Sequence, residues 1–262
     1  MKKEAKKQIS LEEKKSVQLE MLKEIDAFCR ENNIRYSLAF GTLLGAIRHK
    51  GFIPWDDDVD IMMPLPDMLR FKKMFCSKTI KYCDVDTEKY YEFGFSRLAN
   101  IDTYNQTGII AKSYGVCIDL YPIVAIPKEI KERDSFFQKA TVLFEHRIRL
   151  MKWKKQLVRY FPVKTIPGFK KAMKDYRDYM LNTYDYGSTG EFYIVAGRLS
   201  IRNRTMYDFD LFEDMMEVDF EGSKFWSISK YDFFLTLMYG DYMTPPPENQ
   251  RHPYHGGHYY WK

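Results

Sequence analysis

The chain has 262 residues, 45% of them hydrophobic and 29% charged, so it can bury a substantial core and does not belong to the disordered class. It has no CxxC pair and no run of 18 apolar residues, which argues against a zinc or thiol-redox motif and against a membrane-spanning helix. The lysine-rich first residues lack a following hydrophobic region, so we expect no signal peptide and a cytoplasmic protein.

The first 50 residues predict a helix, a strand and a second helix. Residues 11–32 carry apolar side chains at helical spacing among charges. Residues 34–40 predict a strand, and residues 43–49 have helical character. Gly41 and Thr42 would then occupy a strand-to-helix turn, where free backbone N–H groups can bind a phosphate.

The remaining chain alternates between short strands and longer helices. After a loop at 51–55, a strand is predicted at 58–63 and is closed by Pro64. Further elements are expected in this order: a helix at 67–76, strands and hairpins at 80–98 and 107–125, helices over 129–182 with a break at 162–168, and a short helix at 231–239. The proline-rich, aromatic tail after 239 predicts an ordered wrap or a loose tail without regular structure.

Four aspartates in five positions, Asp56, Asp57, Asp58 and Asp60, lie at the edge of the predicted strand 58–63. Unpaired charge beside a core strand is costly, and a bound cation removes that cost. Side chains at i and i+2 of a strand share a face, so Asp58 and Asp60 would project together. Carboxylates combined with substrate phosphates suit Mg²⁺, with Mn²⁺ as an alternative.

Asp119 is the single acid in the apolar stretch "GVCIDLYPIVAIP", and it could complete a three-carboxylate site for phosphoryl transfer. A calcium-binding EF-hand is disfavoured, because counting from Asp56 gives Ile61 and Asp67 where glycine and glutamate are required. A solvated acidic loop stays open as an alternative, as does a purely structural role for Asp119. P-loop, GxGxxG, GxSxG and HExxH motifs are absent.

The stretches "GTLLGAIRHKGFIPWDDDVDI", "GVCIDLYPI" and "YGDYMTPPPENQRHPYH" resemble the LicD family of phosphotransferases, which is related to the fukutin-type proteins. The resemblance covers residues 20–125 and 230–256. It implies an α/β (α+β) fold of nucleotidyltransferase type, in which a mixed sheet has flanking helices and a helical insertion. We expect a single domain over 1–262, with the insertion at 129–182.

The same resemblance implies the transfer of a phospho-alcohol, above all phosphocholine from CDP-choline, to a hydroxyl of a cell-surface glycan or glycolipid precursor. Carried over by position, three aspartates would bind the metal and do the catalysis, one acid would support them, and seven residues are candidates for binding the donor. The catalytic and metal-binding residues are Asp58, Asp60 and Asp119, the supporting acid is Asp56, and the donor-binding candidates are Gly41, Thr42, Arg48, Arg97, Arg251, His252 and His255.

Two alternative functions stay open, together with alternative roles for some of the candidate residues. The chain could be a nucleotidyltransferase that adds NMP to a small molecule, or a non-catalytic relative that binds nucleotide or glycan. Arg48 could equally well form an ion pair with Asp56 or Asp57. Arg97, Arg251 and the two histidines could equally well have a surface role.

The net charge of +5 is concentrated in one segment, since ten Lys or Arg and no acid lie between His146 and Lys174. The simplest interpretation is a helix that packs on the catalytic core, with solvated lysines. The alternative is that this segment docks on the anionic inner face of the cell membrane, where each cation contributes about 1 kcal/mol to the binding free energy. Nucleic acid is the third candidate partner, and the LicD-like motif argues against it.

Overall fold

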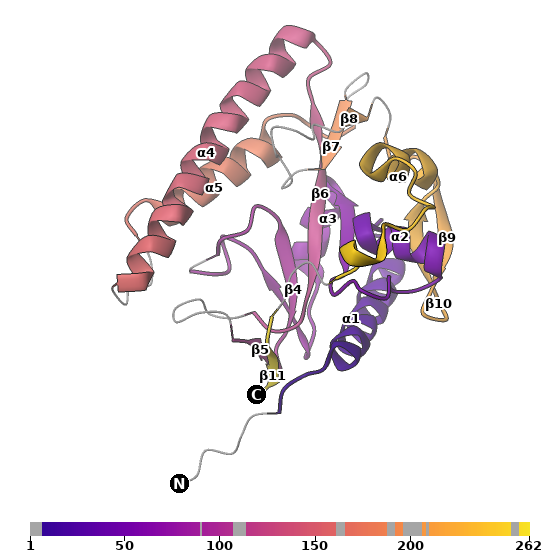
Figure 1. Ribbon diagram of the computed structural model, residues 1–262. Coiled ribbons are helices and arrows are strands. Elements are labelled where there is room, and N and C mark those ends of the chain that lie inside the picture. The colour runs from indigo at the N-terminus through magenta and orange to yellow at the C-terminus, as the bar shows by residue number, and fades with distance from the viewer. Residues whose placement is uncertain are drawn as a thin grey trace.

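The computed structural model describes residues 7–89, 91–106, 114–160, 166–187, 192–195, 206–207, 210–252 and 257–262, with the backbone alone at 155, 158–160, 192–195 and 206. Within these ranges a mixed sheet occupies the centre of the molecule (Figure 1). Its strands are ordered β1-β2-β6-β4-β3, and β7 and β8 extend it from the far end of β6. The strand bounds are β1 Ser37–Leu38, β2 Asp60–Pro64, β3 Ile80–Cys83, β4 Ser96–Asn100, β6 Cys117–Ile126, β7 Phe192–Val195 and β8 Met206–Tyr207.

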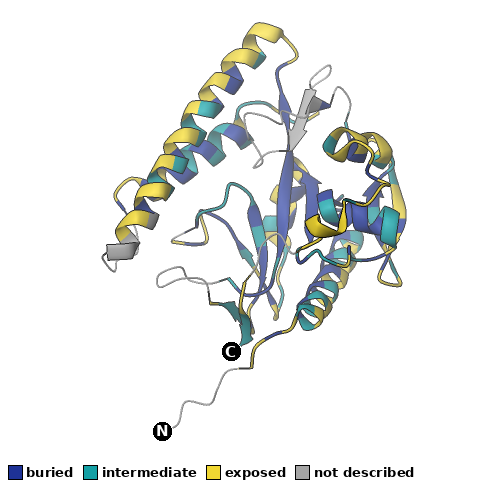
Figure 2. Ribbon diagram, viewed as in Figure 1, coloured by how far each residue is buried: buried dark blue, intermediate teal, exposed yellow. Residues whose placement is uncertain are grey.

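The pairing of β2 with β6 is parallel, whereas β6 pairs with β4 and β7 antiparallel. Nine of the ten residues of β6 are buried, as expected for a central strand covered on both faces (Figure 2). Its sequence is accordingly an apolar run, and Asp119 is its single acid. The architecture confirms the predicted α/β class with a mixed sheet.

Helices flank this sheet on both sides. In Figure 1, α4 and α5 lie to the left of the strands, while α1, α2 and α6 lie to the right with the hairpin of β9 and β10. Phe40 of α2 packs its ring against Tyr121 of β6 and Phe234 of α6, which joins these layers in one apolar core. The helix bounds are α1 Leu11–Glu31, α2 Phe40–His49, α3 Leu65–Met74, α4 Ile130–Tyr160, α5 Phe169–Asn182 and α6 Tyr231–Tyr239, with a short 3₁₀ helix at Glu248–Gln250.

The predicted strand at 34–40 is shorter in the structure, where β1 contains only Ser37 and Leu38. Phe40 has φ of 45°, a left-handed conformation that is strained for a bulky residue and incompatible with a continuing strand. The chain therefore turns there, and α2 begins at Phe40. Gly41 and Thr42 lie in the first turn of the helix and not in a preceding turn.

The predicted strand at 58–63 begins two residues later, at Asp60. Two backbone hydrogen bonds hold the start of this strand. The Ala39 N–H donates to the Asp60 carbonyl, and the Asp119 N–H donates to the Val59 carbonyl. Asp58 therefore precedes the strand. The strand prediction is therefore wrong for Asp58, and strand periodicity does not place its side chain beside that of Asp60.

The helices at 11–32, 129–182 and 231–239 are confirmed with small shifts of their ends. The hairpin of β9 (Met215–Phe220) and β10 (Ser223–Ile228) was not predicted. The tail is partly regular, since β11 (Tyr259–Trp261) pairs with β5 (Thr103–Asn105). The expected break at 162–168 and strand at 107–125 fall partly outside the described residues.

Candidate active site

Three charged residues lie side by side on neighbouring strands of the sheet. Asp60 of β2 is the register partner of Asp119 on β6, and Asp119 is the partner of Arg97 on β4. Register partners project to the same face, so two carboxylates and a guanidinium share one face at this end of the strands. The sequence predicted all three as site residues, and the structure brings them together.

Arg97 forms a two-pronged ion pair with Asp119. Its Nε lies 2.7 Å from Asp119 Oδ1 and its Nη2 donates to Oδ2 at 3.1 Å, with side-chain exposures of 22% and 11%. The guanidinium also lies 3.6 Å from the centre of the Phe93 ring. Burial lowers the pKa of Arg97 and Asp119 raises it, with a net rise. Arg97 thus orients Asp119, a contact that the sequence did not reveal.

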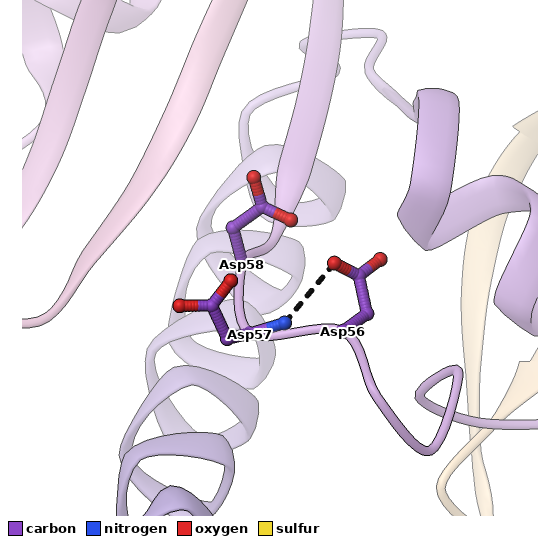
Figure 3. Close-up of side chains that lie close together, drawn as sticks. All are labelled: Asp56, Asp57 and Asp58. Atoms are coloured by element: carbon purple, nitrogen blue, oxygen red, sulfur yellow. Dashed lines mark hydrogen bonds between the residues drawn. The ribbon is translucent and has the colours of Figure 1, made fainter. Parts of the chain in front are cut away.

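A second group of acids lies on the loop that leads into β2. One carboxylate oxygen from each of Asp56, Asp57 and Asp58 falls within 4.8 Å of the others, and the Asp57 N–H donates to Asp56 Oδ1 at 3.0 Å (Figure 3). Among the described residues this is the group with metal-ligand spacing, and it includes neither Asp60 nor Asp119. The predicted trio of Asp58, Asp60 and Asp119 is therefore not assembled as one ligand set.

Asp56 lies against the first turn of α2. A Cβ added at Gly41 would be 2.7 Å from Asp56 Oδ2, so glycine is the residue that leaves room for the carboxylate. Burial, followed by repulsion from Asp58, raises the pKa of Asp56 to about 7. The positive end of the α2 dipole and a nearby cation are both suited to stabilise the ionised form.

The hydroxyl of Thr42 forms a hydrogen bond inside the protein, where the sequence predicted a contact with phosphate. Its buried hydroxyl accepts a hydrogen bond from the Asp60 backbone N–H at 2.8 Å. This contact ties the first turn of α2 to the first residue of β2, and so fixes where Asp60 starts. The predicted contact between Thr42 and donor phosphate stays a prediction.

Lys14 and Asp57 form a buried pair that the sequence reasoning missed. Their charged atoms are 3.0 Å apart, and each side chain is 7% exposed. Lys14 lies on the buried stripe of α1, together with Gln18, whose amide donates to the Cys117 carbonyl at the start of β6. The sequence did contain a signal for this burial, because Lys14 and Gln18 occupy positions on the apolar stripe of the helix.

Arg251 lies beside Trp55, the residue before the acid loop, and Arg48 lies near Arg251. The Arg251 guanidinium is 5.2 Å from the centre of the Trp55 ring, and the His49 ring meets the same indole edge-on. Arg48 donates to the Tyr242 carbonyl at 2.6 Å, while burial and then Arg251 lower its pKa. In the described part of the chain neither arginine has an acidic partner within 4 Å, so the predicted pair of Arg48 with Asp56 or Asp57 does not form.

The two remaining donor-binding candidates are the histidines of the tail. His252 is exposed and directly follows Arg251, at the end of a 3₁₀ turn. His255 lies outside the described residues. Nothing in the described geometry places His252 among the aspartates.

The acids fit a hard divalent cation. Asp57, Asp60 and Asp119 are each at most 8% exposed, and Asp56 and Asp58 are half-buried, so these acids do not form a fully solvated loop. We call this group the acid edge: it consists of Asp56, Asp57 and Asp58 with Asp60 and Asp119, at the N-terminal ends of β2 and β6. The paired cations Lys14 and Arg97 leave an excess of carboxylate, and the donors are oxygens, which Mg²⁺ prefers. A cation held here would add positive charge close to the N-terminus of α2, where phosphate oxygens are favoured.

Comparison with known proteins places this geometry in context. Residues 33–177 match the family described as LicD/FKTN/FKRP, nucleotidyltransferase domain. The matched region contains the acid loop, β2, β4 and β6, together with α4 and most of α5.

Three relatives share stretches of sequence with the chain. A protein of Haemophilus influenzae named lipopolysaccharide cholinephosphotransferase LicD is 26% identical, in a match that covers 95% of this chain and 97% of the relative. An uncharacterised protein of Rickettsia typhi is 41% identical over 69 residues, or 26% of this chain and 22% of its own length. One from Rickettsia prowazekii is 40% identical over 62 residues, or 23% of each chain.

Proposed function

Because the chain belongs to the LicD/FKTN/FKRP nucleotidyltransferase-domain family, we propose that it transfers phosphocholine, or a related phospho-alcohol, from a CDP-linked donor to a hydroxyl of a cell-surface glycan precursor. Membership confirms the predicted family and the transferase class. The observation that carries the proposal is the alignment of Asp60, Asp119 and Arg97 across three strands, beside the acid loop. The full-length relative named a lipopolysaccharide cholinephosphotransferase supports phosphocholine and a lipopolysaccharide acceptor.

Mg²⁺ would be held by Asp58, Asp60 and Asp119, with Asp56 in support, once binding brings these three carboxylates within ligand distance of one another, which they are not in this structure. When bound, the ion supplies positive charge to the phosphate oxygens of the donor. Asp57 is a further candidate ligand, since it shares the close group with Asp56 and Asp58, although Lys14 already neutralises it.

The acceptor hydroxyl would give its proton to Asp119. Arg97 engages both oxygens of this carboxylate, but each oxygen keeps a second lone pair that can accept a proton from an adjacent hydroxyl. The hydroxyl oxygen then forms a bond to the choline-bearing phosphorus, and the bond from that phosphorus to CMP breaks. Arg97 would hold Asp119 in place during this step.

Arg48 and Arg251 would bind the diphosphate of the donor. Arg251 lies next to Trp55, one residue before the acid loop, and Arg48 is close enough to Arg251 for that charge to lower its pKa. Neither arginine has an acidic partner in the described residues. Positive charge next to the leaving group favours departure of CMP. The Trp55 ring could also stack on the cytosine base.

The outer face of α4 is suited to peripheral contact with an anionic membrane. Arg149, Lys152, Trp153 and Leu157 are exposed, which combines cations with large apolar side chains. None of the described helices has the length and apolarity of a membrane span. Flotation with anionic and with neutral vesicles tests this contact, and equal behaviour with both would remove it.

Product analysis tests the proposed reaction. The protein would be incubated with CDP-choline, CDP-ethanolamine, CDP-glycerol or CDP-ribitol in the presence of Mg²⁺ and a glycan acceptor. We expect CMP release with one of these donors, together with label from the alcohol on the acceptor. Release of pyrophosphate from an NTP, and no turnover of any CDP-alcohol, would instead establish nucleotidyl transfer.

A further inference from the structure

The buried amine of Lys14 contacts both an acid and an aromatic ring. Its Nζ is 3.0 Å from Asp57 Oδ2 and 4.6 Å from the centre of the Tyr259 ring, and its side chain is 7% exposed. A buried ammonium loses its hydration, which a carboxylate and the face of a ring can both replace. The carboxylate belongs to the acid loop, whereas the ring belongs to β11, the last strand of the chain.

β11 is held along both of its edges, which gives the Tyr259 ring a fixed position. One edge pairs with β5 (Figure 1). On the other edge, the Ile9 N–H donates to the Tyr259 carbonyl at 2.8 Å, and the Trp261 N–H donates to the Lys7 carbonyl at 3.0 Å. The end of the chain is thus tied to the segment that leads directly into α1, the helix that carries Lys14.

Tyr259 lies close to both parts of the acid edge. Burial raises the pKa of its phenol to about 12, so the ring stays uncharged at neutral pH. Smaller effects on this pKa come from the ionisable groups of Cys117, Arg97, Asp57 and Asp119. Because such effects fall off with distance, the phenol lies near the acid loop and also near the pair of Arg97 and Asp119.

Lys15, the next residue of α1, shows what is particular about Lys14. Its amine donates to the carbonyls of Ile53 and Pro54 at 3.2 and 3.1 Å, and it lies 5.3 Å from the centre of the Phe52 ring. The ring partner of Lys15 therefore comes from the same loop. The ring partner of Lys14 comes from the other end of the chain and connects that end to a carboxylate of the acid loop.

We propose that Tyr259 is a positioning residue for the transfer reaction: its ring holds Lys14 against Asp57, and the last strand thereby fixes the acid loop at the start of β2. The effect on turnover rests on the proposed function. Tyr259 acts here through Lys14 and touches neither donor nor acceptor. Without the ring the amine keeps one partner and the loop can shift, and a shift of about 1 Å can lower catalysis about a hundredfold.

A double-mutant cycle in EDTA tests the contact without any need for turnover. Denaturant unfolding would be measured for the parent protein, Tyr259→Leu, Lys14→Met and the double variant. We expect Tyr259→Leu to raise the unfolding constant about tenfold more in the parent than in the Lys14→Met background, where the ring has no cation to hold.

Tyr260→Leu is the matched control for this cycle. Tyr260 is on the same strand, and its side chain points to the opposite face, where its ring stacks on Tyr104 with 5.4 Å between the centres. Its substitution removes an aromatic contact of β11 that does not involve Lys14. The effect of Tyr260→Leu on the unfolding constant should therefore be the same with and without Lys14→Met.

Kinetics test the effect on the reaction. Tyr259→Leu should lower kcat for CMP release about tenfold or more, while KM for the CDP-alcohol stays within about twofold, because the proposed donor arginines are untouched. Tyr259→Phe keeps the face of the ring and should restore most of the parent kcat. Tyr260→Leu should keep the parent kcat.

Three results would overturn the proposal: no coupling in the cycle, a parent-like kcat in Tyr259→Leu, or a loss in Tyr259→Phe as large as in Tyr259→Leu. A parent protein that releases no CMP from any CDP-alcohol would instead refute the proposed function, and with it the role of Tyr259 in turnover. The cycle in EDTA would still decide whether Tyr259 holds Lys14.

Discussion

The acid edge of the sheet and the surroundings of Arg147 on α4 both bury charge, with opposite signs. At the acid edge, carboxylates outnumber the paired cations Lys14 and Arg97. The Arg147 guanidinium is buried, and its Nε and Nη1 have no hydrogen-bond partner among the described residues. The acids are suited to a divalent cation, whereas the guanidinium of Arg147 contacts the faces of the Phe144 and Tyr176 rings.

The two regions differ in how firmly the fold positions them. The acid edge is held by register between β2, β6 and β4, by Thr42 and by the Lys14 pair. The position of Arg147 depends on the packing of α4 against α5 (Figure 1). Substitutions at the acid edge should therefore affect chemistry, and those at Arg147 should affect the packing of α4 and so the stability.

The largest effect is expected for Asp60→Asn. Removing one carboxylate from the proposed metal site should lower kcat for CMP release by about a thousandfold, as for other losses of electrostatic stabilisation. The metal-free protein should melt no lower than the parent, because a repelling charge is removed. Asp219→Asn, at a side chain 59% exposed on β9, is the control. Activity near the parent level in Asp60→Asn would refute the metal assignment.

Arg97→Met should destabilise the protein by about 3 kcal/mol, because Asp119 would stay buried without its partner. Denaturant unfolding measures this loss. The double variant Arg97→Met with Asp119→Asn should recover part of it. If the single variant unfolds like the parent, the pair contributes little, and Arg97 is free to serve the donor alone.

Gly41→Ala tests the contact between α2 and Asp56. The new Cβ would force the Asp56 carboxylate away, and a displacement of about 1 Å can lower catalysis by about a hundredfold. The melting temperature should change little, since alanine favours a helix. Measuring kcat and melting temperature together decides the point, and unchanged kcat would show that the position of Asp56 is unimportant.

Arg48→Met and Arg251→Met should each raise KM for the CDP-alcohol about tenfold, which corresponds to one charge-assisted hydrogen bond. The value of kcat should fall less. Lys73→Met, an exposed cation on α3, serves as the control. Parent-like KM values in both variants would show that the donor phosphates bind elsewhere.

The smallest effect concerns pH. Burial and Asp58 raise the pKa of Asp56 from its usual value to about 7, so the folded protein holds this proton more tightly than the unfolded chain does. Stability of the metal-free protein should therefore fall as pH rises from about 4 to 7. The charges of Asp57, Asp58 and Lys15 also act on Asp56. Asp56→Asn should flatten this slope relative to Asp219→Asn, and an unchanged slope would contradict the assignment.

The sequence predicted best where periodicity and local chemistry agree. The helices at 11–32 and 129–182 follow from apolar spacing, and Asp60 and Asp119 follow from acids embedded in apolar strands. It predicted poorly where tertiary contacts decide. The left-handed Phe40 ends β1 early, and the start of β2 at Asp60 removes the shared face with Asp58.

The sequence also did not predict contacts between residues that are far apart along the chain. Lys14 meets Asp57 across 43 positions, and Arg97 meets Asp119 across 22. The basic run at 146–174 gave no sign of which cations are buried. Arg147 and Lys154 lie seven residues apart and are both buried, whereas Arg149 and Lys152 are exposed. Figure 2 shows buried and exposed residues alternating along α4. Only the packing of α4 separates the two classes.

The central claim is that the acid edge binds a divalent cation together with a CDP-alcohol. Melting temperatures of the parent and of Asp60→Asn, measured with CDP-choline in Mg²⁺ and in EDTA, test it most directly. We expect CDP-choline to stabilise the parent only with Mg²⁺, and more than CDP does, while Asp60→Asn shows no metal-dependent gain. Equal stabilisation of both proteins, or of the parent in EDTA, would contradict the claim.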